Sequence, residues 1–252
     1  MLMLDIRKNY FLLLFLVLTA PAALAQQMKP EATEDWSRKP PLVTPGNSSQ
    51  PPSDAIVLFG GKQDLNKWEH LDGSPVKWKT EGEALVIEKD ATDIRTKQAF
   101  GSVQLHVEWQ TPDPREDQSN SRGNSGVFLM GLYELQIYES YRDMSRIYYN
   151  GQAGSVYKQH IPLVNASLPP QTWQTFDIVF TAPVFHADKT LKTPAYLTVH
   201  HNGVLILNHV ALKGPMQYQG LPQYTYHPEK LPLSLQEHDS RVRFRNIWVR
   251  EL

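Results

Sequence analysis

The chain has 252 residues, no cysteine and a formal net charge of −1. Without cysteine it can form neither a disulfide framework nor a lipid-modified or nucleophilic thiol. A net charge close to zero also argues against nucleic acid as a partner, because proteins that bind nucleic acid usually present a basic face.

Residues 1–25 have the layout that is typical of a secretory signal peptide. Arg7 and Lys8 precede an apolar run over residues 10–20, and the small-residue sequence A-L-A ends at Ala25. The run is shorter than the roughly 20 apolar residues that a membrane-spanning helix needs. The sequence therefore predicts export to the periplasm or the medium, cleavage after Ala25 and no stable membrane span.

Residues 26–53 are polar and rich in proline, as in KPPLVTPGNSSQPPS, and show no apolar periodicity. Such a segment cannot bury enough apolar surface to offset its ordering entropy, so we predict a disordered linker. The remaining residues, 54–252, have the length of one large β domain.

The rest of the chain consists of short segments in which apolar residues recur at every second position, and it has no long amphipathic helix. Val103, Leu105, Val107 and Trp109 are an example. Further strands are predicted at EALVIE (83–88), GVFLM (126–130), YELQIY (133–138), TFDIVF (175–180), YLTVHHNGVLILNHV (196–210) and VRFRNIWV (242–249). Asn202-Gly203 in the fifth of these is typical of a two-residue hairpin turn. About ten short strands separated by turns indicate an all-β, two-sheet antiparallel jelly-roll sandwich.

The segment YELQIY carries polar side chains at alternating positions. In a strand, residues two apart share a face, so Glu134, Gln136 and Tyr138 point one way and the apolar Leu135 points the other. Glu139 would fall on the Leu135 side unless a β-bulge shifts the register, and bulges are common beside active sites.

Residues 123–131 can pair with this segment as a hairpin, so we expect the strand to be central in its sheet. Large aromatic residues flank the polar positions, as is common where a cleft binds a sugar ring. The alternative is an outer sheet face whose polar residues merely contact water.

A second polar group lies near the end of the chain, where Gln236, His238, Arg243, Arg245 and Asn246 fall within eleven residues. His238 precedes the last strand, in a loop, and functional groups are frequent in loops. Arg243 and Arg245 share one face of that strand. The alternative is that these side chains are only solvated.

Four segments and their order resemble the 3-keto-disaccharide hydrolase family. They are RGNSGVFLMGLYELQIYESY, GQAGSVYKQHIPLVNASLPPQTWQTFDIVFTAPVF, HHNGVLILNHV and LQEHDSRVRFRNIWVREL, within a similarity that runs from Val57 to Leu252. Members usually read R-Y-E-V-Q-I-L-D-S-Y in the middle strand, where this chain has Leu132 in place of Arg and Glu139 in place of Asp. Their Q-D-H-G near the end is Gln236-Glu237-His238-Asp239 here.

The resemblance implies a concanavalin-like jelly roll with a sugar-binding cleft and an enzyme that cleaves 3-keto-glycosides. The ketone at C3 acidifies the proton on C2, so a general base can remove it, the aglycone leaves C1 and water then adds. Glu134 or His238 could be the base, and both could bind a divalent metal ion; no other cofactor is implied. The enolate oxygen could be held by Arg243, Lys158 or such a metal ion.

The predicted catalytic residues are Glu134, His238 and Glu139. The predicted substrate-binding residues are Arg122, Asn124, Gln136, Tyr138, Tyr157, Lys158, Arg243 and Arg245. The predicted partner is an oligosaccharide or glycoside substrate, with a sugar 3-oxidising dehydrogenase as a functional partner.

Two other functions are compatible with the sequence. A retaining glucanase would use Glu134 and Glu139, although Gln136 stands where the laminarinase-type enzymes of this fold group have a central carboxylate. A lectin-like domain would bind sugar without turnover.

Overall fold

The computed structural model describes residues 29–47, 50–142 and 148–252, so the predicted signal peptide lies outside the described residues. Contacts divide the chain into two units, Met1–Leu42 and Val43–Leu252. In the described part of the first unit the one regular element is a short 3₁₀ turn, η1 (Pro30–Thr33).

The second unit begins ahead of residue 54, the predicted start of the domain. The Ser53 backbone N–H donates to the Thr44 carbonyl at 3.1 Å, and the Asn47 N–H donates to the Gln50 carbonyl at 2.8 Å. The end of the predicted linker is therefore a hydrogen-bonded turn that belongs to the compact unit.

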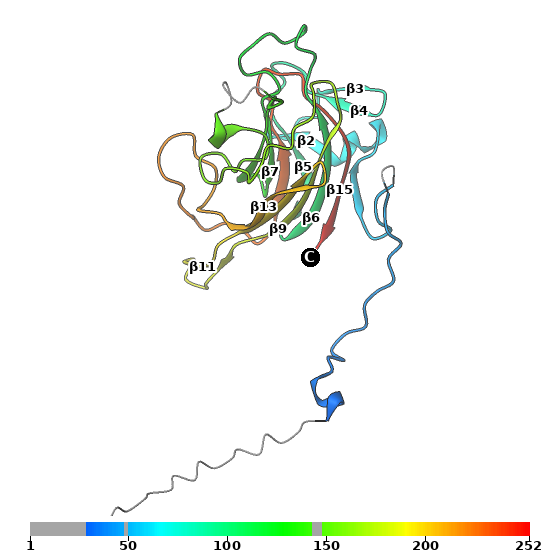
Figure 1. The fold of residues 1–252 in the computed structure, drawn as a ribbon, viewed down its shortest axis with the longest axis vertical. Helices are drawn as coiled ribbons and strands as arrows, with labels where there is room; N and C mark the ends of the chain where they lie inside the picture. The colour runs from blue at the N-terminus through cyan, green and yellow to red at the C-terminus, as the bar shows by residue number, and fades with distance from the viewer. Residues whose placement is uncertain (1–28, 48–49, 143–147) are drawn as a thin grey trace, which may run out of the picture. The chain divides into compact units, whose positions relative to one another are not determined.

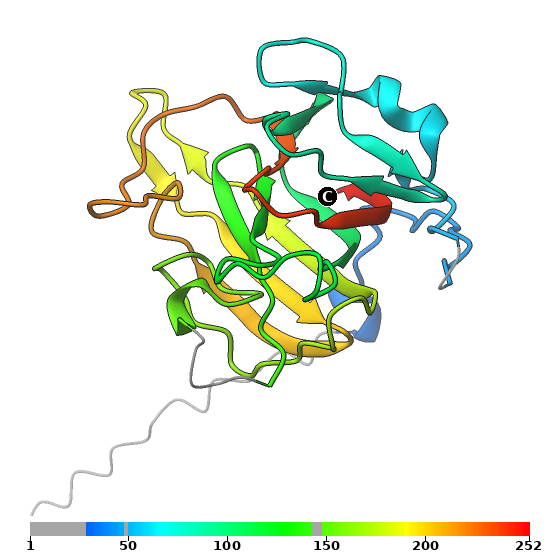
Figure 2. The same ribbon diagram turned by 90° about the horizontal axis from the view of Figure 1, so that it is seen from above.

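The domain is an all-β sandwich of two antiparallel sheets, as predicted (Figures 1 and 2). The larger sheet has eight strands. In spatial order they are β13 (Val204–Ala211), β12 (Tyr196–His201), β9 (Gln174–Thr181), β6 (Val103–Gln110), β15 (Arg243–Glu251), β4 (Ala84–Val86) and β3 (Lys79–Glu81), with β1 (Ile56–Phe59) also paired to β15.

The smaller sheet has five strands, in the order β2 (Trp68–His70), β5 (Ile94–Phe100), β14 (Leu231–Leu235), β7 (Ser125–Leu129) and β8 (Tyr133–Ile137). A separate hairpin consists of β10 (Val184–Phe185) and β11 (Leu191–Thr193). Two 3₁₀ turns, η2 (Lys62–Lys67) and η3 (Tyr149–Gly151), complete the described elements.

The core lies between the two sheets and is built from the inward half of each alternating strand. On β8 the inward side chains are Tyr133, Leu135 and Ile137, all buried. The Tyr133 ring lies 5.6 Å from the ring of Phe180 on β9, so the contact joins one sheet to the other. Burial of each such side chain contributes about 1.5–3 kcal/mol, and this fixes which face of every strand points outward.

The predicted hairpins are confirmed. Asn202 and Gly203 have φ angles of 52° and 79°, as a two-residue turn of this type requires.

Residues 125–129 pair with residues 133–137, as predicted. The expectation that this second strand is central is wrong, because β8 lies at the edge of the five-stranded sheet.

Loops cover the free side of β8. Gly154 donates to the Gln136 carbonyl at 2.9 Å, Gln136 donates to the Ser155 carbonyl at 3.0 Å, and Met216 donates to the Leu132 carbonyl at 2.9 Å. These bonds flank Glu134 along the edge, at Leu132 and Gln136, and they hinder pairing of the edge with another chain.

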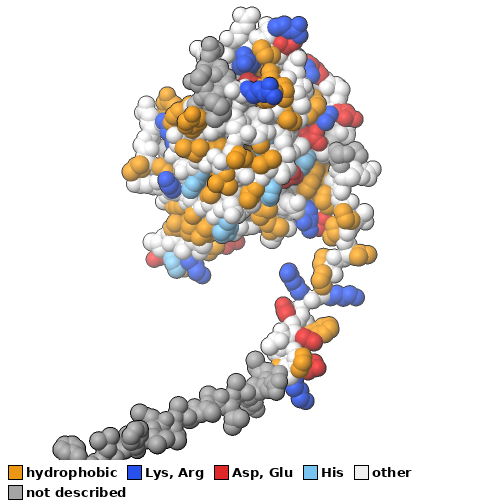
Figure 3. Space-filling model, viewed as in Figure 1, with side chains coloured by type: hydrophobic (Ala, Val, Ile, Leu, Met, Phe, Trp, Pro, Cys, Tyr) orange, Lys and Arg blue, Asp and Glu red, His pale blue; other side chains and the backbone are white. Residues whose placement is uncertain are grey.

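Hydrophobic side chains on the face shown in Figure 3 are interspersed with neutral polar surface and several histidines. Within the described residues, no helix is long and apolar enough to span a membrane.

Candidate active site

Five side chains cross the outer face of the five-stranded sheet in one line, which we call the cross-strand row. In spatial order they are Glu69 (β2), Arg95 (β5), Ser234 (β14), Phe128 (β7) and Glu134 (β8), each opposite the next in register. Directly opposed residues of antiparallel strands share a face, with Cβ atoms about 5 Å apart. Their neighbours along each strand point into the core, so the row lies on the outer side of the sheet; Glu69, Arg95 and Phe128 are partly exposed there, and Ser234 and Glu134 are buried.

Glu134 is the buried carboxyl of this row. Its residue is only 4 % exposed, and none of the described residues makes a hydrogen bond or ion pair with its carboxyl group. Burial, reinforced by the negative charge of Asp93, raises the pKa of Glu134 to about 7. A carboxyl group that titrates near neutral pH can accept and return a proton under physiological conditions.

Gly126 makes room for this carboxyl group. A Cβ at position 126 would lie 2.6 Å from Glu134 Oε1 and 2.9 Å from Phe128 Cε2, both too close for real atoms. The carboxyl oxygen and the edge of the ring therefore share the space directly above Gly126. Any side chain at this position would displace one of them.

Asp93 connects Glu134 with the loop that carries His238. Asp93 directly precedes β5, and its Oδ1 accepts a 2.9 Å hydrogen bond from the Glu237 backbone N–H. Burial raises the pKa of Asp93, and His238 opposes that shift by its charge. The structure thus places the exposed His238 near Asp93 on the Glu134 side of the sandwich.

Gln136, Asn124 and Tyr138 extend the same face beside Glu134, as the alternation predicts. The Gln136 side-chain nitrogen lies 2.8 Å from Asn124 Oδ1, 2.8 Å from the Ser125 carbonyl and 2.9 Å from the carbonyl of its own neighbour. The amide donors of Gln136 are therefore used within the protein. Tyr138 donates its hydroxyl proton to the Asn120 carbonyl, and burial raises the pKa of the Tyr138 hydroxyl.

Arg122 lies in the loop before β7, with Nη1 3.3 Å from the Asp117 carbonyl. Its Nε is buried and has no hydrogen-bond partner among the described residues. The charge of Arg122 opposes the rise in the Tyr138 pKa, which places the two side chains near each other.

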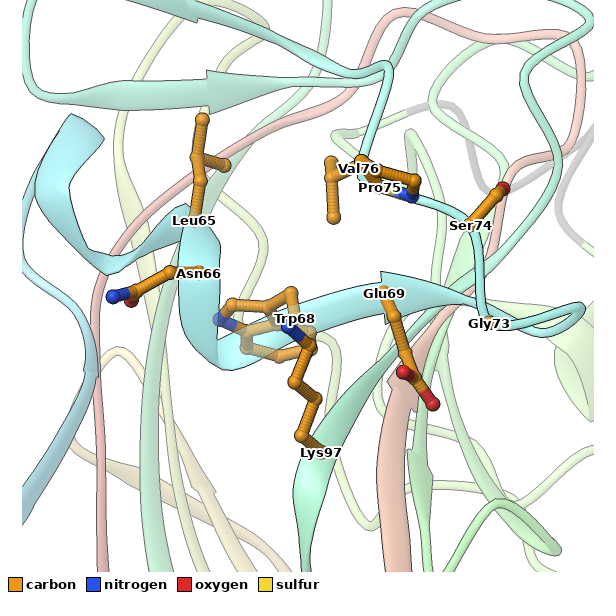
Figure 4. Close-up of a pocket in the computed structure, with 9 residues that line it drawn as sticks. All are labelled: Leu65, Asn66, Trp68, Glu69, Gly73, Ser74, Pro75, Val76 and Lys97. Carbon is orange, nitrogen blue, oxygen red and sulfur yellow. The ribbon is translucent and has the colours of Figure 1, made fainter.

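A cavity of about 230 Å³ opens over the middle of the cross-strand row. Its walls include Asp93, Arg95, Phe128 and Ser234. A second cavity, of about 240 Å³, lies beyond β2 and is shown in Figure 4. In that view the Glu69 carboxylate points away from the apolar wall of the second cavity, and its Oε1 accepts hydrogen bonds from Arg95 at 3.0 and 2.9 Å. Glu69 lines the second cavity and its ion-pair partner Arg95 lines the first.

Glu139 does not join Glu134. The register of β8 runs without interruption from Tyr133 to Ile137, so its paired part has no bulge, and Glu139 follows after the strand has ended. Glu139 Oε2 accepts a 2.6 Å hydrogen bond from the Thr111 hydroxyl, and Oε1 accepts one of 3.0 Å from the Tyr141 backbone N–H. The alternative in which a bulge brings Glu139 onto the face of Glu134 and Gln136 is therefore wrong, and Glu139 holds the chain by hydrogen bonds where it leaves the sheet.

Arg243 and Arg245 lie on the opposite side of the sandwich. Their strand, β15, belongs to the eight-stranded sheet, and both side chains point outward from it. Arg243 forms an ion pair with Glu81. Arg245 forms one of 2.6 Å with Glu108, and its guanidinium group stacks on a tryptophan ring. The prediction that they bind substrate together with Glu134 is wrong, because alternation along a strand does not reveal which sheet the strand enters.

Tyr157 and Lys158 lie in the loop that covers the edge of β8. The Lys158 ammonium group lies 5.2 Å from the centre of the Tyr157 ring and 4.7 Å from that of Tyr218, and it donates to the Tyr218 carbonyl at 2.7 Å. Lys158 is thus held beside the sheet face and does not belong to the cross-strand row.

A metal ion at Glu134 and His238 would need further ligands. Within the described part of the chain, no three histidine, aspartate or glutamate side chains converge as a metal site requires.

Sequence reasoning missed half of the face, namely Glu69, Asp93, Arg95, Phe128 and Ser234. The alternating charges of D-I-R-T-K over residues 93–97 were the available signal for β5. Only the register between strands distant in sequence reveals that these residues face Glu134.

Comparison with known proteins identifies the family. The sequence profile of the 3-keto-alpha-glucoside-1,2-lyase-like domain matches residues 54–250. The chain belongs to this family. The match spans both sheets and the whole cross-strand row, and it agrees with the resemblance that the sequence motifs indicate.

Three solved structures from Parabacteroides distasonis ATCC 8503, each described as a candidate glycosyl hydrolase, are similar to this family member. One is 43 % identical, covers 89 % of this chain and 97 % of its own, and superposes with a TM-score of 0.82. The other two are 19 % and 20 % identical, with TM-scores of 0.56 and 0.55; both cover 79 % of this chain, and 94 % and 99 % of their own, so they show the shared fold. A search of curated proteins finds no significant match.

Proposed function

We propose that this protein is an exported enzyme that cleaves the glycosidic bond of 3-keto-glycosides by removing the proton on C2. The observation that supports this most directly is Glu134, a buried carboxyl group that has no partner among the described residues and whose pKa is raised to about 7. Family membership and the similarity to candidate glycosyl hydrolases support glycoside cleavage in general.

In the first step the Glu134 carboxylate takes the C2 proton. The electrons of the C2–H bond form a C2=C3 double bond, and the C3 ketone oxygen becomes an enolate. Arg95 is a cation of the same face, and Glu69 occupies its Nε and Nη2, which leaves Nη1 to contact ligand. We assign it to the enolate oxygen, because a fixed cation in a partly desolvated site stabilises developing negative charge.

In the second step the enolate re-forms the ketone, the C1–O bond breaks, and a C1=C2 double bond remains in the sugar. The departing aglycone oxygen takes a proton, which protonated Glu134 can return directly or through water. Addition of water across C1=C2 then gives the free 3-keto sugar, so the net reaction is hydrolysis. The ketone must be supplied by an oxidation at C3, the reaction of a sugar 3-oxidising dehydrogenase.

The retaining glucanase is less well supported than this elimination. It needs two carboxyl groups about 5–5.5 Å apart. Glu139 follows the end of β8 and is engaged with Thr111 and Tyr141, so it does not share the outer face with Glu134.

The test is turnover of a 3-keto-glucoside and of its unoxidised parent by purified protein, with and without EDTA. We expect release of the aglycone from the ketone alone. Cleavage of the unoxidised parent at a similar rate would contradict the elimination and favour a glycosidase. Sugar binding without product, unchanged in Glu134→Gln, would indicate a lectin-like domain.

A further inference from the structure

Phe128 is the aromatic side chain of the cross-strand row, directly opposite Glu134 on one side and Ser234 on the other. Unlike the apolar side chains of the core, it is half-buried, and it forms part of the wall of the 230 Å³ cavity. A phenylalanine on the outer face of a sheet contributes little to the core between the sheets. Its position therefore points to contact with a ligand.

Gly126 lets the Phe128 ring and the Glu134 carboxyl group meet. Both approach the space where a Cβ of residue 126 would lie, so the ring edge and the carboxyl oxygen are neighbours on one surface. A pyranose ring placed over this surface would present a single face to both groups. The face of the sugar ring that carries the C2 proton removed by Glu134 is then also the face that packs against Phe128.

We propose that Phe128 is the platform for the sugar ring and that it selects 3-keto-hexosides whose 4-hydroxyl group is equatorial. The inference rests on the proposed function, since it takes the C2 proton as the atom that Glu134 removes. Removal of that proton needs an axial C2–H bond, aligned with the π system of the C3 ketone.

The stereochemistry of the sugar ring determines why an equatorial 4-hydroxyl group is preferred. In a gluco-configured pyranose the axial hydrogens of C2 and C4 lie on the same face of the ring. A ring with H2 above Glu134 therefore presents H4 to the same protein surface, where the flat Phe128 ring can pack against C–H bonds. In the galacto-configured ketone the 4-hydroxyl group takes the place of H4, and it would point into the phenyl ring without a hydrogen-bond partner.

The experiment compares two 3-keto-glycosides with the same aglycone, one gluco- and one galacto-configured at C4, on wild type, Phe128→Leu and Phe128→Ala. We expect wild type to favour the gluco ketone in kcat/KM by about 10-fold or more, the usual range for one misplaced group in a shaped pocket. Phe128→Leu should reduce that ratio several-fold, and Phe128→Ala should bring it close to one, with a higher KM for the gluco ketone. Comparing ratios between variants cancels any difference in intrinsic reactivity between the two ketones.

Phe185→Leu is the matched control, because Phe185 is a half-buried phenylalanine at a different cavity, on β10. It should leave the wild-type ratio unchanged, and melting curves verify that all variants are folded. A ratio that stays at the wild-type value in both Phe128 variants overturns the platform, and so does a wild-type preference for the galacto ketone. If wild type turns over neither ketone, the proposed function itself has failed, which is a distinguishable result.

Discussion

Replacement of Glu134 by Gln should abolish turnover and, at alkaline pH, make the domain more stable. Burial raises the pKa of this carboxyl group from 4.5 to about 7. Because the fold favours the protonated form of Glu134, that form adds to the free energy of unfolding relative to the ionised form. This contribution is fully present below the unfolded-state pKa of 4.5 and is lost as the pH rises through 7. At about 1.4 kcal/mol for each pKa unit, the ionised carboxylate destabilises the fold by about 3 kcal/mol at pH 8.

Glutamine has the shape of the protonated acid and stays neutral at every pH. For a domain of this size, 1 kcal/mol corresponds to about 2–4 °C in melting temperature, so Glu134→Gln should melt about 6–12 °C above wild type at pH 8. The two proteins should melt together at pH 4.5 and below. Loss of the base should lower kcat by about 100-fold or more at pH 7 and above, where wild-type Glu134 is ionised.

Thermal unfolding followed by circular dichroism at pH 4.5 and pH 8 measures the difference. Glu83→Gln is the control, because Glu83 is an exposed glutamate in the turn between β3 and β4 and its removal should change neither curve. The reasoning fails if Glu134→Gln melts at or below wild type at pH 8. It fails equally if the gain is the same at both pH values, since that would come from packing and not from charge.

Four further predictions follow from the same structure and sequence. The kcat/KM of wild type on the 3-keto-glucoside should fall about tenfold for each pH unit below 7, as Glu134 becomes protonated, and a flat profile between pH 5 and 7 would exclude it as the base. Glu139→Gln should keep measurable activity in steady-state assays, because its carboxylate binds Thr111 and not the cavity, whereas complete loss would favour a retaining glycosidase. Sequencing of the exported protein should find Gln26 at its N-terminus, and an intact initiator methionine would contradict the signal peptide. Deletion of residues 26–42 should leave the melting temperature nearly unchanged, and a fall of several degrees would mean that this segment packs on the domain.

The parts of the site that depend on local alternation could be predicted from the sequence. Period two along YELQIY separates Glu134 and Gln136 from Leu135, and the structure places them on opposite faces as expected. Alternation is a property of the backbone of a single strand, and it survives in any sheet that buries one of its faces.

The parts that depend on long-range pairing could not be predicted. Arg95 reaches the Glu134 face because β5 and β8 enter the same sheet, with β14 and β7 between them. Arg243 and Arg245 were assigned to the wrong side of the molecule for the same reason, since β15 pairs with β6 and β4. No pattern within one strand encodes its neighbours, so the sequence identified the base candidate but not the cation that accompanies it.

The position of β8 explains how a destabilising carboxyl group can be held in place. An edge strand is normally the least constrained strand of a sheet, yet backbone hydrogen bonds from Gly154, Ser155 and Met216 hold β8 on either side of Glu134. The Glu134 side chain is then carried by a rigid backbone while its oxygens lack a donor from the described residues. A ligand that brings its own hydroxyl and C–H groups to that carboxyl group gains an interaction that the protein does not supply itself. A carboxyl group that is fixed but unsatisfied in the free protein suits the proposed role of base, and the stability cost calculated for ionised Glu134 is the expected counterpart of that arrangement.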